Sequence, residues 1–83
     1  MTTQYLVQIH QRDPRTQNRR LLTEVALSAP EEASTPILVA LATRQATKAG
    51  VPVRGRTEKT ILALRAVDPI TGVRAWRTVA AGV

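Results

Sequence analysis

Apolar and polar residues alternate along four short stretches of the chain, and this alternation predicts β-strands with two different faces. The stretches run over about Tyr5–Arg12, Arg19–Leu27, Thr60–Val67 and Val73–Ala80. Between the second and third stretches, apolar residues recur at helical spacing from Pro36 to Ala49. Thr35-Pro36 is a helix start signal, and Gly50 is a stop signal. A further short helical turn is expected at Ala29–Ala33, so the pattern predicts the order β-β-α-β-β.

One turn motif occurs twice, and each copy joins two predicted strands. Leu6–Thr16 reappears as Ile61–Thr71, and both copies end in Asp-Pro-x-Thr. Proline presets the backbone at the second position of a type I turn, and the Asp side chain accepts backbone N–H groups. Gly72 follows the second turn and Gln17-Asn18 follows the first, where a left-handed residue closes the loop. The repeat therefore predicts two similar β-hairpins.

The expected pairing within each hairpin predicts which side chains share a face of the sheet. Five-residue loops set Ile9 opposite Leu21 and Leu64 opposite Trp76, and alternate residues then lie on one face. One face is expected to be apolar, to carry the helix and to form the core with Leu38 and Leu41: Tyr5, Val7, Ile9, Leu21, Val25, Leu27, Leu62, Leu64 and Trp76. The other is expected to be basic and open: Gln8, His10, Arg12, Arg20, Leu22, Ala63, Arg65, Ala75 and Arg77.

The expected fold is a single α+β domain over residues 1–83, with a four-stranded, mostly antiparallel sheet and one helix packed on one face. The order resembles a β-grasp (ubiquitin-like) chain, because Leu22–Pro52 follows its succession of strand, capped helix and Gly-x-Pro exit. The C-terminal Ala80–Val83 lacks the paired glycines that a conjugated modifier needs. The sequence thus leaves two architectures open, one β-grasp-like and one a pseudo-symmetric repeat of two hairpins.

Composition narrows the setting in which such a domain works. The chain has 83 residues of which only 2% are aromatic, so we expect a thin core that a partner would help to stabilise. Cysteine is absent, which excludes disulfides and thiolate metal sites and fits a reducing compartment. Without an apolar run long enough to span a bilayer, the chain is expected to be cytoplasmic and to have no membrane partner.

Candidate catalytic and ligand-binding residues are few. His10 is the only histidine, and neither a convergent ligand set nor a clustered carboxylate pair accompanies it. We therefore expect no enzyme activity, no metal site and no cofactor. Trp76 is a candidate for stacking on a nucleic-acid base. Because the pairing places it opposite Leu64 on the helix face, we expect it in the core instead.

The net charge of +6 comes almost entirely from arginine, which suits contacts with phosphates or carboxylates. The candidate contacts are Arg12, Arg20, Arg65 and Arg77 on the expected basic face, with Arg54 and Arg56 beside Gly55 in a loop. We expect a small accessory or regulatory protein that binds DNA or RNA through phosphates, of the kind that phages and other mobile elements encode. Three alternatives stay open: an interaction module or inhibitor on an acidic host protein, a structural subunit of an assembly such as a virion, and a homodimer formed through a sheet edge.

Overall fold

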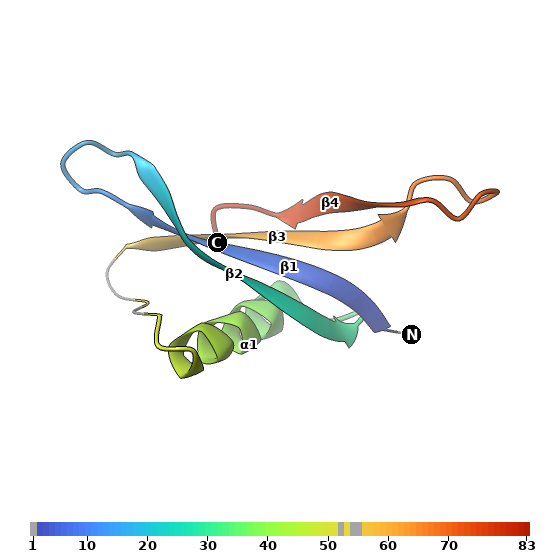
Figure 1. The fold of residues 1–83 in the computed structure, drawn as a ribbon, viewed down its shortest axis with the longest axis horizontal. Helices are drawn as coiled ribbons and strands as arrows, with labels where there is room; N and C mark the ends of the chain where they lie inside the picture. Colours follow the sequence, from blue (N-terminus) through green and yellow to red (C-terminus); the bar gives the residue numbers. More distant parts are fainter. Residues whose placement is uncertain (1, 52, 54–55) are drawn as a thin grey trace.

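The computed structural model describes residues 2–51, 53 and 56–83, which form one four-stranded sheet and one helix. The elements are β1 (Thr2–Arg12), β2 (Arg19–Pro30), α1 (Thr35–Lys48), β3 (Thr57–Ala66) and β4 (Arg74–Ala80). The strand order is β2-β1-β3-β4, and all neighbours are antiparallel (Figure 1). The predicted α+β class and the order β-β-α-β-β are confirmed.

The sheet consists of two hairpins that meet through their first strands. β1 and β3 form the central pair, and β2 and β4 are the two edges. Because β1 and β3 are antiparallel, the two hairpin turns lie at opposite ends of the molecule (Figure 1). Of the two architectures that the sequence left open, this order is the one that a repeat of two hairpins predicts.

The repeated turn folds in the same way in both hairpins, as predicted. In each, the Asp carboxylate accepts the backbone N–H two residues on, at 2.8 Å for Asp13 and 2.9 Å for Asp68. The N–H of Gln17 donates to the Asp13 carbonyl at 2.8 Å, and that of Gly72 donates to the Asp68 carbonyl at 2.9 Å. Gln17 (φ 62°) and Gly72 (φ 71°) both adopt the left-handed conformation that closes the loop.

The helix ends where the sequence predicts. Gly50 has φ 85°, its N–H donates to the carbonyl of Thr47, and the N–H of Val51 donates to the carbonyl of Ala46, both at 3.0 Å. These two bonds define a Schellman motif, which satisfies carbonyls that the helix leaves free. At the other end, the short helical turn expected at Ala29–Ala33 is only partly right. Ala29 and Pro30 belong to β2 because they pair with the start of β1, and a single turn follows in which the N–H of Ala33 donates to the carbonyl of Pro30 at 2.9 Å.

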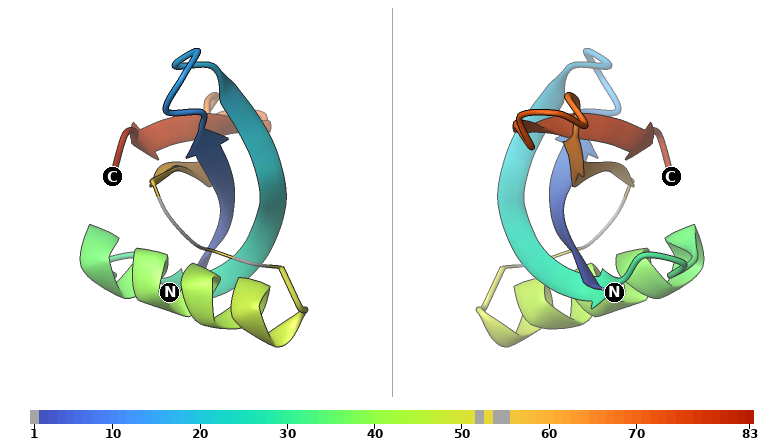
Figure 2. Two further views of the ribbon diagram at one scale, coloured as in Figure 1. Left: turned by 90° about the vertical axis from the view of Figure 1, so that its left-hand side faces the viewer. Right: turned by 90° about the vertical axis from the view of Figure 1, so that its right-hand side faces the viewer.

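The core lies between α1 and one face of the sheet. The helix packs against β2 and β1, and Figure 2 shows it lying across the curved strands. Its buried residues, Leu38, Ala42 and Ala46, are four apart and so form one stripe. The buried strand residues are Tyr5, Val7, Ile9, Val25, Leu27, Ala29, Ile61 and Ala63.

The first hairpin has the predicted faces but a shifted register. Arg12 pairs with Arg19 around the loop Asp13–Asn18, and a bulge beside Ile9 adds one more residue to β2. Together, the longer loop and the bulge move the pairing by two positions, which restores the alternation and places Val7 opposite Val25. The residues of β2 around and before the bulge are the exceptions: Leu21 lies on the open side and is 45% exposed, Leu22 packs against the core, and Arg20 lies on the core side.

The predicted facing of the second hairpin is wrong by one residue. Ile61 and Ala63 pair with Val7 and Tyr5 and are fully buried, so Leu62 and Leu64 lie on the opposite face. A tight turn determines the register within a hairpin, as the confirmed pairing of Leu64 with Trp76 illustrates. No such turn joins β1 to β3, and a shift of one residue between them reverses every side chain.

Because of this reversal, several large apolar side chains that were predicted in the core lie on the opposite face of the sheet. We call the sheet face away from α1 the open face; its apolar residues are Leu6, Leu21, Ala26, Leu62, Leu64, Ala66 and Trp76. Leu62 and Leu64 are half-buried there, and Trp76 is 44% exposed. On α1, Leu41 is 36% exposed, so it too lies outside the core in which it was predicted.

Candidate functional site

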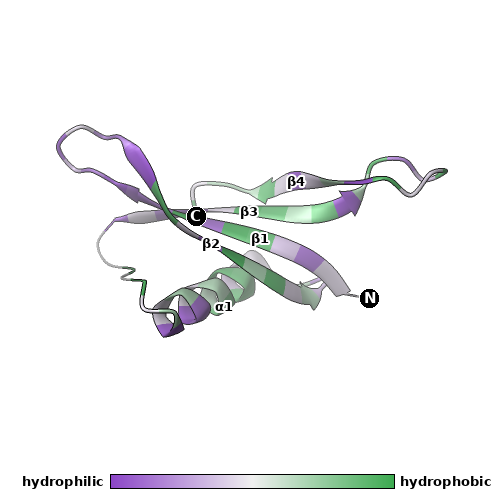
Figure 3. Cartoon of the chain, in the orientation of Figure 1, coloured by the Kyte–Doolittle hydropathy of each residue, from purple (hydrophilic) through white to green (hydrophobic). Residues whose placement is uncertain are grey.

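Basic side chains gather where the β1–β2 hairpin turns. Arg12 ends β1 while Arg19 and Arg20 begin β2, so the hairpin brings all three together. They line an open groove together with Gln11, Asp13, Pro14, Thr16 and Asn18. Figure 3 shows this end of the molecule as predominantly hydrophilic.

The start of β3 adds to this cluster. The N–H of Arg12 donates to the carbonyl of Arg56 at 3.2 Å, which places Arg56 beside the hairpin. We call the group Arg12, Arg15, Arg19, Arg20 and Arg56 the basic hairpin end. Asp13 and Glu58 are the acidic residues within it, so positive charge predominates.

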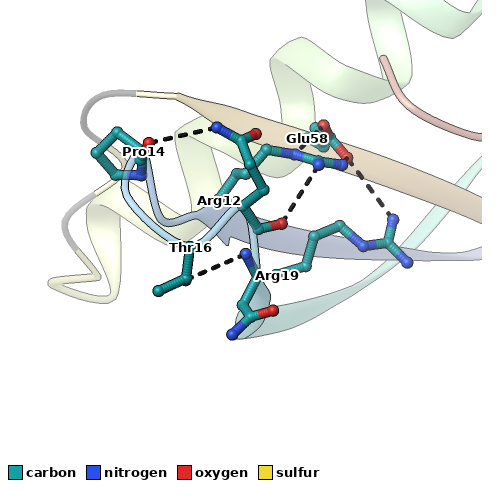
Figure 4. Close-up of polar contacts among 7 residues, drawn as sticks. Arg12, Pro14, Thr16, Arg19 and Glu58 are labelled. Atoms are coloured by element: carbon teal, nitrogen blue, oxygen red, sulfur yellow. Dashed lines mark hydrogen bonds and ion pairs between the residues drawn. The ribbon is translucent and has the colours of Figure 1, made fainter.

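Glu58 organises two of these arginines. Its carboxylate accepts two bonds from Arg12, at 2.9 Å from Nε and 3.2 Å from Nη2, and lies 3.6 Å from Nη1 of Arg19 (Figure 4). The hydrogen bond from Arg12, with the charges of both arginines, lowers the pKa of Glu58 below its ordinary 4.5. The two-point contact holds the Arg12 guanidinium at the mouth of the groove.

The other arginines of the cluster keep their donors open. Arg15, Arg20 and Arg56 are exposed, and they form no ion pair with any residue that the structure describes. A guanidinium in this state presents up to five N–H donors in a planar fork, a geometry that matches phosphate and carboxylate oxygens.

The structure brings together three of the six predicted contact residues. Arg12, Arg20 and Arg56 belong to the basic hairpin end, and Arg54 lies outside the described residues. Arg65 and Arg77 lie elsewhere, on the second hairpin.

The prediction of one basic sheet face is wrong. Arg77 pairs with the buried Ala63, and Arg65 lies two residues from Ala63 on β3, so both arginines project from the face that carries the core. By the β1–β2 register, Arg20 lies on that face too, whereas Arg12 lies on the open face. For Arg65 and Arg77 the reason is the one-residue reversal of β3 and, with it, β4; for Arg20 it is the register of the β1–β2 pair before the bulge.

Two arginines of the basic hairpin end, Arg15 and Arg19, were missed because the prediction sought residues on one face. Side chains at a hairpin tip converge whichever face they leave from. Both arginines lie between Arg12 and Arg20, in a segment of nine residues. The density of arginine on both sides of a predicted turn was the signal available in the sequence.

The remaining candidate features are metal ligands, the single histidine and a membrane-spanning helix. Among the described residues, no three His, Cys, Asp or Glu side chains lie close enough to hold a metal ion. His10 pairs across the strands with Leu21 and Glu58, on the open face. Within residues 2–51, 53 and 56–83, no helix has the length and apolar character needed to cross a membrane.

Comparison with protein-family models, with curated proteins and with solved structures finds no match to this chain.

Proposed function

We propose that the protein binds nucleic acid through backbone phosphates, with the basic hairpin end as the main contact. The observation that carries this proposal is the common groove of Arg12, Arg19 and Arg20, with Arg56 held beside it. Guanidinium groups at several points along a groove suit a chain of phosphates, because each group releases counterions when it neutralises one phosphate.

The lining of the groove favours phosphates over an acidic protein surface. Apart from Pro14, its residues are polar or charged, and it lacks an exposed aromatic or large aliphatic side chain. Protein interfaces obtain most of their affinity from such apolar anchors in a dry centre. Phosphate contacts, in contrast, form readily in a solvated groove and carry little sequence information.

The test replaces the two arginines of the groove that depend least on Glu58. In the double variant Arg19→Gln with Arg20→Gln, the bidentate pair between Arg12 and Glu58 stays intact. Duplex DNA and single-stranded RNA are titrated at two or more salt concentrations. Each lost phosphate contact is expected to lower the log–log salt slope by about one, so the double variant should lose about two.

The matched control removes the same charge from a different surface. Arg44 and Lys48 are exposed on α1, and Arg44→Gln with Lys48→Gln should leave the salt slope as in the parent. If neither nucleic acid binds at low salt, or if the Arg19 and Arg20 variant binds as well as the parent, the proposal fails. An acidic protein partner would then be the next candidate.

A further inference from the structure

The open face carries an exposed tryptophan at the end of the sheet away from the basic hairpin end. Trp76 of β4 pairs with Leu64 of β3 and is 44% exposed. Together with Gln4, Ala26 and Ser28 it lines a shallow hollow, so the hollow extends over β1 and β2, beyond the partner strand β3. The ring thus rests on the sheet while part of its surface stays open to solvent.

Packing against the helix does not account for the position of Trp76. α1 covers the other face, where Tyr5, Val7 and Ile61 are buried. Exposing an indole ring to water forgoes the gain of burying one of the largest apolar side chains. An aromatic ring left in that position, with half-buried Leu62 and Leu64 beside it, marks a surface for contact.

Positive charge lies close to Trp76 on its own strand. Arg74 lies two residues earlier and so projects from the same face, whereas Arg77, the next residue along the chain, projects from the opposite face of the same edge strand. Both are exposed, as is Arg65 on β3. The acidic residues on this side of the tryptophan include Glu31, which lines a second hollow with Arg65 and Arg74, and Asp68 in the adjoining turn.

An exposed aromatic flanked by arginines matches the chemistry of unpaired nucleotides. A base that is free of its partner stacks on an indole, and the adjoining phosphates bind guanidinium groups. Bases in a duplex are already stacked on one another and offer no free face to a side chain. A second copy of this chain fits less well, because its own β4 would bring a second Arg74 to the contact.

We infer that Trp76 stacks on a base of single-stranded nucleic acid, while Arg74 on the same face contacts an adjoining phosphate. The inference rests on the proposed function and deepens it by naming the substrate class. It assigns the second hairpin a separate role, since the basic hairpin end contacts phosphates of any nucleic acid, whereas the tryptophan distinguishes unpaired bases.

The experiment exploits Trp76 as the only tryptophan in the chain, so fluorescence excited at the red edge of indole absorption, where Tyr5 absorbs little, reports on it alone. Three probes are titrated: a single-stranded oligothymidylate of about fifteen nucleotides, a duplex of equal length, and polyphosphate, which has charge without bases. We expect the oligothymidylate to quench the fluorescence and polyphosphate to leave it unchanged. Trp76→Leu should weaken binding of the single strand about tenfold and binding of the duplex less than twofold, with Trp76→Phe between parent and Leu variant.

The outcomes separate this inference from the proposed function. If the parent binds all three probes without quenching, and Trp76→Leu binds the single strand as well as the parent does, stacking is wrong while phosphate binding stands. If the parent binds none of the probes at low salt, both proposals fail. An equal loss of affinity for polyphosphate and oligothymidylate in Trp76→Leu also overturns stacking, because the substitution would then act on charge contacts. Melting curves verify that both variants fold.

Discussion

Ile61 and Leu64 differ by three positions on β3 and therefore lie on opposite faces of the sheet. Ile61 is fully buried opposite Val7, whereas Leu64 is half-buried on the open face. Ile61→Ala leaves a cavity in the core and should cost about 2–5 kcal/mol of unfolding free energy. Leu64→Ala should cost less than half as much. Denaturant unfolding of the two variants checks this, and a larger loss for Leu64→Ala would contradict the assignment of the faces.

Glu58 should make the protein sensitive to acid in a defined direction. Its pKa is lower in the native state than the ordinary 4.5, so its ion pair stabilises the fold above that pH and is lost as pH falls through the native value. Glu58→Gln should therefore be less stable than the parent at neutral pH. The difference should shrink as pH falls below 4.5 and vanish once the pH is below the native pKa of Glu58, where both side chains are uncharged.

The comparison between parent and variant at each pH is essential, because Asp68 adds acid sensitivity of its own. The hydrogen bonds from the backbone of Ile70 and from Thr71 lower the Asp68 pKa, and both proteins share this effect. A stability gap between parent and Glu58→Gln that persists unchanged at low pH would refute the role given to the ion pair.

At the scale of the elements, the two turns provide a natural pair of experiments. Gln17 and Gly72 occupy the same left-handed position, which costs a residue with a side chain about 1–2 kcal/mol. Gln17→Gly removes this strain but adds chain entropy to the unfolded state, so we expect a gain of about 0.5 kcal/mol. Gly72→Ala should destabilise by about 1 kcal/mol, although the space around its Cβ position is open.

Thermal melts of both turn variants measure these opposite effects. The Gln17 side chain also donates from Nε2 to the carbonyl of Pro14 at 3.3 Å, and glycine forfeits this bond. A lower melting temperature for Gln17→Gly would mean that the side-chain bond outweighs the backbone strain.

What the sequence predicts correctly in these elements is local. The Asp-Pro turns, the glycine that ends α1 and the pairing of Leu64 with Trp76 each depend on residues close together in the chain. The wrong predictions depend on partners far away. β2 continues past Leu27 because the start of β1 pairs with it, and the face of β3 follows from its contact with β1.

The same distinction holds for the site. Arg12 and Arg20 were predictable together because one turn connects them, but Arg56 reaches them only through the pairing of β3 with β1. Trp76 was predicted in the core because it pairs with Leu64, which was placed on the helix face. Ile61 and Ala63 occupy the core instead.

For the whole molecule, the arrangement of charge follows from its elongated shape. The chain measures 48 × 26 × 19 Å, and the two hairpin turns lie at the ends of the long axis (Figure 1). The basic hairpin end and the arginines beside Trp76 are thus well separated. If a duplex lay along the long axis, the 48 Å length of the protein would cover about 14 base pairs, at about 3.4 Å for each pair.

The antiparallel contact between β1 and β3 also has a consequence for how the chain folds. Each hairpin closes over a short loop and can form early, because few residues must be ordered before its strands meet. Val7 meets Ile61 only after a connection of more than fifty residues, with α1 inside it, has been brought together. Long-range pairing of this kind slows folding, so we expect the docking of the two preformed hairpins to limit the rate at which the native state appears.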